Sequence, residues 1–494
     1  MDPNQRLVVV SNRLPIVLDR SDAGWRLTPG SGGLVSALAP ALSREGGRWI
    51  GWPGRPVPED DPGWREAIDG FAHGEGYGLV PVPLTEEQVD GFYRGFSNGV
   101  LWPLFHDLVG RTDFEPEFWR SYKEVNKLYS EAILRHTEPT DFVWVHDYQL
   151  MLAAERVRRN EAGRDRRLGF FLHIPFPPVD IFLRLPWRRQ ILDDLLCYDL
   201  LGLQTRRDLD NFLACIDRLE PDAVVEQEIG RDRFAIRFED RTLIAGAFPI
   251  GIDAKGFTEE ARSDEVTARV EALTPQIGPY QIILGIDRLD YTKGLPEKML
   301  AFRELLENHP DLREKVVLLQ IVVPSREQVP EYKALKARLD RLVGQINGRF
   351  STAGWVPIQY IYRSISKTDL VSLYRMARIA LVTSLKDGMN LVAKEFVACQ
   401  VAEPGNLALS EFAGAAPQLG DGHRLEKGAL LFNPHDVEQT ADVLYQALRM
   451  GVTERRQRMT AMQGAVAEQD IFWWLESFLD AVPAPAETTA VGGR

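Results

Sequence analysis

Residues 385–395, "LKDGMNLVAKE", join the apolar run "RIALVTS" to a segment with the character of a helix. A buried strand that passes through a glycine-containing loop into a helix is the unit from which parallel α/β sheets are built. Asn390 is a good N-cap residue for that helix. The free backbone amides at such a helix start suit an anion such as a diphosphate.

Two acidic side chains flank this predicted helix start. Asp387 lies in the loop, where its carboxylate can accept hydrogen bonds from sugar hydroxyls. Glu395 lies one to two turns into the helix, where it can hold the hydroxyls of a nucleotide ribose. The spacing therefore fits the two ends of one sugar nucleotide. The simpler alternative is a carboxylate that interacts with the helix dipole, next to a solvated Lys394.

Outward from this stretch, short apolar runs alternate with segments of helical periodicity, a pattern typical of α/β units around parallel sheets. The runs form two sets, separated by the hairpin-like segment 234–247 and a Pro/Gly linker near 249–253. We therefore predict an α/β protein with two parallel-sheet domains. The predicted strands are 6–11, 48–52, 142–146, 167–174 and 200–204 in the first set, and 281–286, 315–323, 357–362 and 379–384 in the second.

The predicted domains cover residues 1–248 and 249–468. Residues 470–482, "DIFWWLESFLDAV", are strongly apolar on one face. We therefore expect a C-terminal helix at 469–482 that packs back across the domain junction. The remaining residues, 483–494, have few apolar side chains to bury and are expected to be disordered.

Composition narrows the choice of partners and compartment. The 494 residues are too many for one ordinary core. A formal net charge of −13 argues against a nucleic-acid partner, because such partners usually select a basic excess. No apolar run has membrane-spanning length and the first residues lack a signal-peptide pattern, so we expect a cytoplasmic protein with no membrane partner. Cys197, Cys215 and Cys399 show no paired spacing, which predicts reduced thiols.

Two common nucleotide signatures are absent from the sequence. The glycine cluster at 29–40, "PGSGGLVSALAP", lacks the full dinucleotide-binding spacing, and no P-loop pattern occurs. Neither a dehydrogenase nor a P-loop ATPase is therefore indicated. Gly32 and Gly33 nevertheless precede a helix-like run, so their amides are placed to face an anion. A plain tight turn is the alternative.

Four cations follow predicted strands. Arg13 stands at the end of the first strand, and Arg326 follows the strand at 315–323. Arg288 and Lys293 lie in a loop that ends at a glycine and a proline-led helix, an arrangement suited to clamping a diphosphate. Charge pairing with Asp287 and Asp290 is the alternative for these two. Because open α/β sheets bind ligands beyond the carboxyl ends of their strands, the four cations indicate focused positive potential for phosphorylated ligands.

Other chemistry-bearing side chains also end strands. His146 and His173 do so, although a lone histidine beside a core strand is more often structural than catalytic. Asp147 is the better candidate for contacting an acceptor hydroxyl, and core packing is the default role of Tyr93 and Trp102. The eight histidines are scattered and no Cys/His ligand spacing occurs, so no metal site is predicted.

Several segments, in order from about residue 6 to about 480, together resemble the trehalose-6-phosphate synthases. These are retaining glycosyltransferases with the GT-B fold, in which two Rossmann-like domains face a central cleft. The family transfers glucose from a nucleotide donor, usually UDP-glucose, to glucose 6-phosphate, forming α,α-trehalose 6-phosphate, and is often dimeric or tetrameric. The resemblance implies the same fold, activity and small-molecule substrates here, with a homodimer or homotetramer. It rests on "VVVSNRLP", "GGLVSAL", "WIGWPG", "FSNGVLWPLFH", "WVHDYQL", "GFFLHIPFP", "RLDYTKGLPE" and "DGMNLVAKE".

The resemblance also implies roles for single residues. Arg13 and Arg326 would bind the acceptor phosphate, and Tyr93, Trp102 and Asp147 would shape the acceptor pocket. The implied donor-binding residues are Gly32, Gly33, Arg288, Lys293, Ile365, Asp387, Gly388, Met389, Asn390, Leu391, Val392, Ala393, Lys394 and Glu395. The implied catalytic residues are Asp147, His173, Arg288, Lys293 and Asp387.

The implied mechanism follows from charge. Arg288, Lys293 and the helix amides would stabilise the negative charge of the departing diphosphate, so no metal or other cofactor is required. His173 would lie near the donor glucose, Asp387 would bind that glucose, and Glu395 would bind the ribose. Retention is expected through front-face attack, in which the departing phosphate oxygen takes the acceptor's proton. The preference for UDP, GDP or ADP as donor nucleotide stays open.

Three other functions fit the same architecture. The intact "SNR" and "GGLV" argue against a glucosylglycerol-phosphate synthase, because acceptor specificity resides mainly in the first domain. The complete "RLDYTKG" and "DGMNLVAKE" argue against a relative that couples a cyclitol. The third alternative is a non-catalytic regulatory subunit, and the presence of every matched site residue argues against it.

Overall fold

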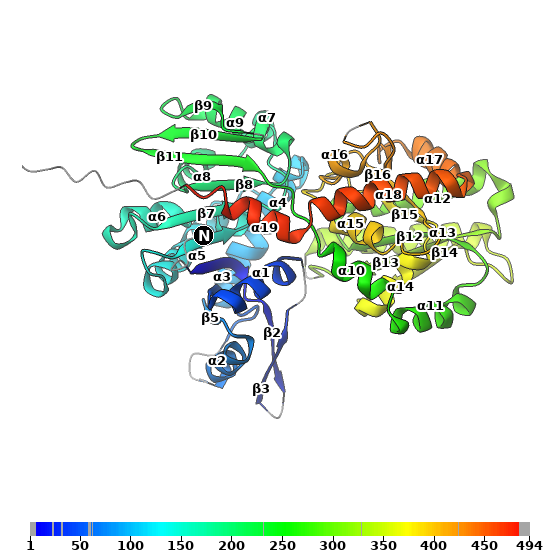
Figure 1. The fold of residues 1–494 in the computed structure, drawn as a ribbon, viewed down its shortest axis with the longest axis horizontal. Coiled ribbons are helices and arrows are strands. Elements are labelled where there is room, and N and C mark those ends of the chain that lie inside the picture. Colours follow the sequence, from blue (N-terminus) through cyan, green and yellow to red (C-terminus); the bar gives the residue numbers. More distant parts are fainter. Residues whose placement is uncertain are drawn as a thin grey trace, which may run out of the picture. The chain divides into compact units, whose positions relative to one another are not determined.

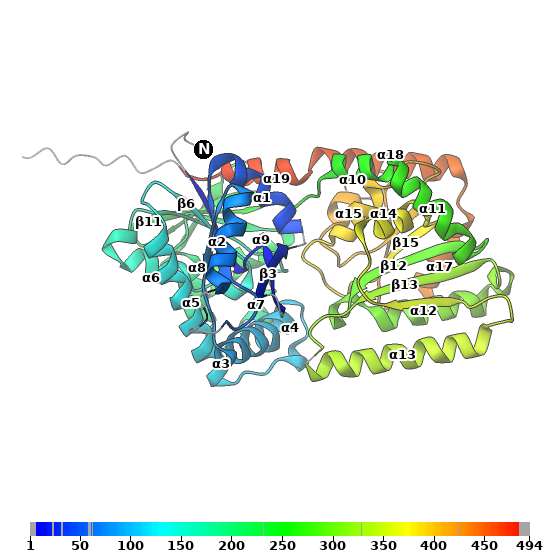
Figure 2. The same cartoon turned by 90° about the horizontal axis from the view of Figure 1, so that it is seen from below.

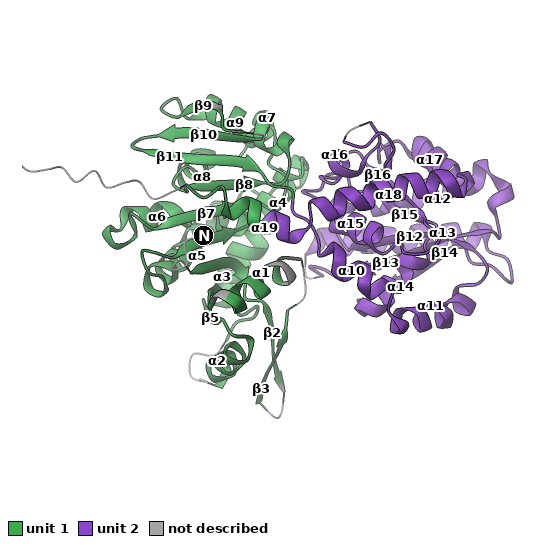
Figure 3. Ribbon diagram, in the orientation of Figure 1, with its two compact units in different colours: residues 1–249, 475–494 green, residues 250–474 purple. Residues whose placement is uncertain are grey.

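The computed structural model describes residues 6–21, 24–30, 33–57, 61, 63–230, 232–327, 329–422 and 424–483. The chain divides into two compact units, one made of residues 1–249 and 475–494 and the other of residues 250–474 (Figure 3). Each unit has its own mainly parallel sheet covered by helices, which confirms the predicted α/β class. Most of the predicted tail lies outside the described residues.

The first unit contains a nine-stranded sheet with the order β5-β4-β1-β6-β7-β8-β11-β10-β9 (Figure 1). Its inner strands are continuous apolar runs because helices cover both faces. The predicted hairpin is the antiparallel pair β10 and β11. The strands are β1 (Leu7–Arg13), β4 (Arg48–Trp52), β5 (Gly78–Pro81), β6 (Phe142–His146), β7 (Arg167–Phe171), β8 (Leu200–Leu203), β9 (Val224–Glu228), β10 (Arg233–Phe238) and β11 (Arg241–Ala247).

The direction of winding reverses in the middle of this sheet. From β1 the chain runs through α1 (Gly33–Glu45) to β4 and β5, and α5 (Pro116–His136) then returns it to β6, on the other side of β1. The carboxyl ends of β1 and β6 therefore meet at a topological switch point, where open α/β sheets bind ligands. Arg13, His146 and Asp147 lie at these two strand ends.

Several elements of the first unit were not predicted from the sequence. They include a separate hairpin, β2 (Ile16–Ser21) and β3 (Gly24–Pro29), and a long π-helix, η1 (Val89–Leu101). The other helices are α2 (Gly63–Glu75), α3 (Glu86–Gln88), α4 (Trp102–Phe105), η2 (Val109–Arg111), η3 (Tyr148–Leu150), α6 (Ala154–Arg159), η4 (Glu161–Gly163), α7 (Val179–Phe182), α8 (Arg188–Leu195) and α9 (Arg206–Leu219).

The second unit has a six-stranded parallel sheet with the order β14-β13-β12-β15-β16-β17. Its strands are β12 (Gln281–Arg288), β13 (Val316–Val323), β14 (Ile358–Tyr362), β15 (Ile379–Val382), β16 (Asn406–Ser410) and β17 (Leu430–Phe432). The winding reverses between β12 and β15, so the loops after these two strands form a second switch point. The predicted cationic loop and the "KDGMN" loop are those two loops.

Helices cover both faces of the second sheet. Figure 2 shows α12, α13 and α17 on one face and α10, α14, α15 and α18 on the other. The helices are α10 (Ala254–Ala261), α11 (Asp264–Ile277), η5 (Tyr291–Lys293), α12 (Leu295–Asn308), η6 (Pro310–Leu312), α13 (Pro330–Phe350), α14 (Lys367–Met376), α15 (Leu391–Ala398), α16 (Ala416–Leu419), α17 (Val437–Arg449), α18 (Val452–Glu468) and α19 (Ile471–Leu479). None of the helices in the described ranges is long and apolar enough to cross a membrane.

The apolar C-terminal helix, α19, provides core side chains to the first unit from Leu475 onward. The ring of Phe478 stacks on that of Trp144, with centroids 4.2 Å apart and planes 7° from parallel. A Cβ atom added to Gly169 or Gly202 would lie 3.2 or 2.7 Å from the Phe478 ring. The two glycines therefore leave the space on the sheet that this ring fills.

The packing of Phe478 predicts a large loss of stability in the variant Phe478→Ala. Because the side chain is fully buried, we expect the free energy of unfolding to fall by about 3–5 kcal/mol. Phe472→Ala is the matched control on the same helix, since Phe472 is 46% exposed and its removal should cost less than about 0.5 kcal/mol. Urea unfolding followed by circular dichroism measures both changes. Equal effects of the two variants would contradict the assigned packing.

Candidate active site

Arg13 ends β1 in the first unit and lies over two aromatic rings. Its guanidinium carbon is 5.1 Å from the ring centre of Trp52 and 5.5 Å from that of Tyr93. Ser11 Oγ donates a hydrogen bond of 2.7 Å to the Arg13 carbonyl oxygen, and Trp49 Nε1 donates to Ser11 Oγ at 2.8 Å. The backbone is thus fixed while the cation stays exposed, an arrangement that suits an anionic ligand.

Two hydrogen bonds and a ring contact connect the two predicted acceptor aromatics, Tyr93 and Trp102. Asn98 Nδ2 donates to the Tyr93 carbonyl oxygen at 2.7 Å, and Tyr148 Oη donates to Asn98 Oδ1 at 2.9 Å. The Tyr148 ring packs against Trp102, with centroids 5.7 Å apart. Sequence reasoning missed Asn98, although a buried asparagine among aromatics signals a required hydrogen-bond network.

Asp147 and His173 meet at the ends of β6 and β7. Asp147 has a φ of 75°, which is strained for a non-glycine residue and typical of functional sites. Its Oδ1 accepts from the backbone N–H of His173 at 3.1 Å. The His146 ring lies next to that of His173, with Nδ1 and Nε2 3.1 Å apart. Burial lowers the pKa of His173 to about 3, and burial also lowers that of His146, so both rings are neutral at pH 7.

In the second unit, Lys293 and Asp387 pair across the switch point. Lys293 Nζ donates to Asp387 Oδ2 at 2.6 Å. The same oxygen also accepts from Ser384 Oγ and Asn390 Nδ2, each at 3.1 Å. Asn390 caps α15, since its Oδ1 accepts from Ala393 N at 3.0 Å. One carboxylate thus organises the cationic loop and the helix start together.

A second strand-end segment holds the "DGM" loop in place. Ala415 N donates to the Met389 carbonyl oxygen at 2.7 Å, and Gly414 N donates to that of Asp387 at 3.0 Å. A Cβ atom on Gly414 would lie 1.8 Å from the Gly388 carbonyl oxygen. Glycine is therefore required at position 414, a contribution to the site that sequence reasoning missed.

Arg288 and Arg326 lie close to a buried aspartate, Asp290. Tyr332 Oη donates to Asp290 Oδ2 at 3.3 Å, and Arg326 Nη1 lies 3.7 Å from the same oxygen. Burial alone would raise the pKa of Asp290, but Arg326, Arg288 and Lys293 together lower it below its ordinary value. Three cations thus act on one carboxylate, but the ion pairs differ from the predicted alternative. Arg326 pairs with Asp290 and Lys293 with Asp387, whereas Asp287 pairs with Lys298.

Glu395 has a hydrogen-bonded position on α15. Tyr374 Oη donates to Glu395 Oε2 at 2.8 Å. Burial raises the pKa of Glu395, while the hydrogen bond from Tyr374 and the charge of Lys367 lower it. The tyrosine fixes the direction of the carboxylate, and it was not predicted because it lies on a different helix.

The sequence-based alternative of a solvated Lys394 is wrong. The Lys394 side chain is fully buried, and its Nζ donates to the Ile250 carbonyl oxygen at 2.7 Å. Burial lowers its pKa to about 7. Its side chain points into the core of its own unit, so any contact with a donor would come from the Lys394 backbone.

This buried lysine predicts a pH-dependent stability. Lys394 keeps its proton up to about pH 10.5 in the unfolded chain but only to about 7 in the fold. The unfolded state therefore binds more protons in this window, and stability rises with pH there and is flat below it. From pH 7 to 9, the stability of the wild type relative to Lys394→Met should rise by about 2 kcal/mol. Lys255→Met is the control, since Lys255 is 84% exposed and the difference should stay constant. Urea unfolding at several pH values measures both differences. A stability difference between wild type and Lys394→Met that does not change with pH would contradict the lowered pKa of Lys394.

The remaining predicted donor residues are distributed as follows. Gly32 lies outside the described residues, and Gly33 is the first residue of α1. Leu391 and Val392, in the first turn of α15, are partly exposed. Ile365 lies in the turn before α14, whose N-cap Ser366 accepts from Asp369 N at 3.0 Å.

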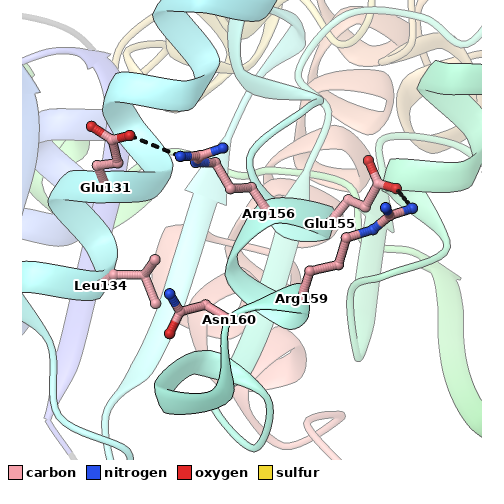
Figure 4. Close-up of a pocket in the computed structure, with 6 residues that line it drawn as sticks. All are labelled: Glu131, Leu134, Glu155, Arg156, Arg159 and Asn160. Atoms are coloured by element: carbon pink, nitrogen blue, oxygen red, sulfur yellow. Dashed lines mark hydrogen bonds and ion pairs between the residues drawn. The ribbon is translucent and has the colours of Figure 1, made fainter.

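Two surface cavities of the first unit lie away from these residues. The larger, of about 490 Å³, is lined by Glu131, Leu134, Glu155, Arg156, Arg159 and Asn160 (Figure 4). Two ion pairs, Glu131 with Arg156 and Glu155 with Arg159, satisfy its charges internally. The second, of about 410 Å³, is lined by residues of α2, β5 and α5. Neither cavity includes a predicted site residue, and no cluster of potential metal ligands occurs within the described part of the chain.

Comparison with known proteins assigns the family. The model of glycosyltransferase family 20 matches residues 5–484. A trehalose-6-phosphate synthase of Mycolicibacterium vanbaalenii is 43% identical over 479 residues, covering 96% of this chain and 95% of the relative. The crystal structure of an α,α-trehalose-phosphate synthase (UDP-forming) from Burkholderia xenovorans, in complex with glucose 6-phosphate, has a TM-score of 0.84 and 34% identity, covering 97% of this chain and 99% of the other. A structure from E. coli, bound with UDP-2-fluoro glucose, has a TM-score of 0.85 and 35% identity, covering 98% of this chain and 100% of the other. These similarities confirm the GT-B fold, and the chain belongs to glycosyltransferase family 20.

Proposed function

We propose that the protein transfers glucose from UDP-glucose to glucose 6-phosphate with retention, forming α,α-trehalose 6-phosphate. The observation that carries the proposal is that each unit has one switch point with predicted site residues, so that the two switch points can bind the two substrates. Arg13, Tyr93 and Asp147 lie around one switch point, and Lys293 and Asp387 lie at the other. Relatives named for this synthase activity match nearly the whole chain.

The first unit is proposed to bind the acceptor. Arg13 carries an exposed positive charge for the sugar phosphate, and the partly exposed ring of Tyr93 would provide a surface for the sugar. Trp102 is only 6% exposed and would shape the pocket through its packing against Tyr148. Asp147 faces the same strand ends and would accept a hydrogen bond from the acceptor's hydroxyl. We also propose that Arg326, which pairs with the buried Asp290, is a ligand of a substrate phosphate.

The second unit is proposed to bind the donor. Arg288 and Lys293 would neutralise the diphosphate as its bond to glucose breaks, together with the amides that begin α15. Asp387 would hold glucose hydroxyls and Glu395 those of the ribose. Since this chain's own cations supply the charge, we propose that transfer needs no divalent metal. Front-face attack, with the leaving phosphate oxygen taking the acceptor's proton, accounts for retention.

The test is an assay of nucleotide release from UDP-, GDP- and ADP-glucose, with and without glucose 6-phosphate and with EDTA present. We expect release that depends on the acceptor, is fastest with UDP-glucose and is unaffected by EDTA. NMR of the product should show an α,α-1,1 linkage. Glycerol 3-phosphate as acceptor tests the glucosylglycerol-phosphate alternative, and donor binding without release would identify a non-catalytic relative. The expected homodimer or homotetramer stays a prediction for sedimentation to test.

A further inference from the structure

Two neighbouring residues at the end of β6 hold His173 in different ways. Asp147 Oδ1 accepts from the His173 backbone N–H, at 3.1 Å. The His146 ring approaches the His173 ring itself, with His146 Nδ1 3.1 Å from His173 Nε2. The dipeptide therefore fixes both the backbone and the ring of His173. In the backbone contact the donor is the N–H of His173. In the ring contact either His146 Nδ1 or His173 Nε2 can be the donor.

The surroundings of His146 keep the pair of rings uncharged. The His146 side chain is fully buried, and its ring packs against those of Trp144 and Phe171, with centroids 4.6 and 6.5 Å away. An imidazolium among these rings would be costly, and burial lowers the pKa of both histidines. Each ring therefore carries one proton, on either Nδ1 or Nε2.

The surroundings of His146 Nε2 determine which nitrogen of the His146 ring carries the proton. His146 Nε2 is buried and has no hydrogen-bond partner among the residues that the structure describes. A proton on Nε2 would leave a buried N–H without an acceptor, and orphaned buried N–H groups are rarer than unpaired acceptors. The proton therefore belongs on His146 Nδ1, which faces His173 Nε2. His173 Nε2 must then accept, so the His173 proton lies on Nδ1.

We propose that His146 is a positioning residue that donates from Nδ1 to His173 Nε2 and thereby holds His173 in its Nδ1–H tautomer. His173 then acts toward the sugar donor as a hydrogen-bond donor through Nδ1, and the sugar hydroxyl that it meets accepts. This last step rests on the proposed function, because it places His173 beside the donor glucose. The tautomer itself does not depend on that function.

The first test is NMR of the full chain with ¹⁵N-labelled histidine at pH 7.5. Long-range ¹H–¹⁵N correlations distinguish the two tautomers, and the variant His173→Asn identifies the signals of His173. We expect His146 and His173 both to be protonated on Nδ1. Protonation of His173 on Nε2 would overturn the proposal. Since this measurement uses no substrate, it remains decisive even if the protein transfers no glucose, and the two failures are distinguishable.

The second test compares two substitutions of His146. His146→Leu removes the donor, so the His173 signals should show a mixture of tautomers and kcat/KM for UDP-glucose should fall about tenfold. His146→Asn keeps an N–H near the place of Nδ1 and should retain kcat/KM within about threefold. The affinity for UDP alone, which lacks the glucose, should not change in either variant. Wild-type kcat/KM in His146→Leu with an unchanged His173 tautomer would contradict the positioning role.

Discussion

Lys293→Met is expected to lower kcat for glucose transfer by about 10²- to 10³-fold, with a smaller change in the KM for glucose 6-phosphate. The lysine is a partly buried cation, with 13% of its side chain exposed, at the switch point of the proposed donor-binding unit. Negative charge appears on the leaving diphosphate only as the glycosidic bond breaks. A fixed cation in such a place therefore stabilises the transition state more than the bound substrate.

The single variant also leaves Asp387 without its cation, which would destabilise the fold and complicate the result. The matched control is the double variant Lys293→Met/Asp387→Asn, in which both charges are removed. We expect thermal unfolding of the double variant to return toward that of the wild type while kcat stays low. Recovery of kcat in the double variant would contradict the proposal, because it would mean that Lys293 serves only to neutralise Asp387.

The strands that carry the site were predictable because each is recognised from the residue types of one short segment. A strand covered on both faces is a continuous apolar run, and β1, β6, β12 and β15 each have this pattern. The side chain after such a run lies at the carboxyl end of the sheet, so Arg13, Asp147 and Asp387 were found by position alone. The hairpin of β2 and β3 was missed because the apolar run of β2, Ile16 to Leu18, has only three residues, and no side chain of β3 is buried.

The contacts within the site depend on residues that are distant in the sequence. A solvated Lys394 was the simpler alternative because a single helical lysine usually is solvated, but its partner carbonyl lies 144 residues away. Asn98 bonds to Tyr148, and Tyr374 bonds to Glu395, each across separate elements. Such partners are decided by the packing of helices onto the sheet, which a pattern of residue types does not specify. The π-helix η1 has no sequence period of its own by which to predict it.

Arg13→Met is expected to raise the KM for glucose 6-phosphate roughly 30- to 100-fold, because charge-assisted hydrogen bonds to a phosphate contribute about 2–3 kcal/mol. The methionine keeps much of the arginine's contact with the rings of Trp52 and Tyr93 but has no charge. Initial rates at varied glucose 6-phosphate measure the change. The KM for UDP-glucose should remain close to that of the wild type.

Glucose without a phosphate separates a phosphate ligand from a merely structural arginine. If Arg13 acts through the phosphate, wild type and Arg13→Met should use unphosphorylated glucose at the same low rate. The ratio of kcat/KM for glucose 6-phosphate to kcat/KM for glucose should therefore be much smaller in the variant. Arg65→Met is the matched control, because Arg65 also lies over a tryptophan, 4.3 Å from the ring centre of Trp64, but lines the second surface cavity, which includes no predicted site residue. This control variant should leave the rates with glucose and with glucose 6-phosphate unchanged. An equal loss with glucose and glucose 6-phosphate in Arg13→Met would instead mean that the arginine supports the fold of the strand end, and would refute its assignment to the acceptor phosphate.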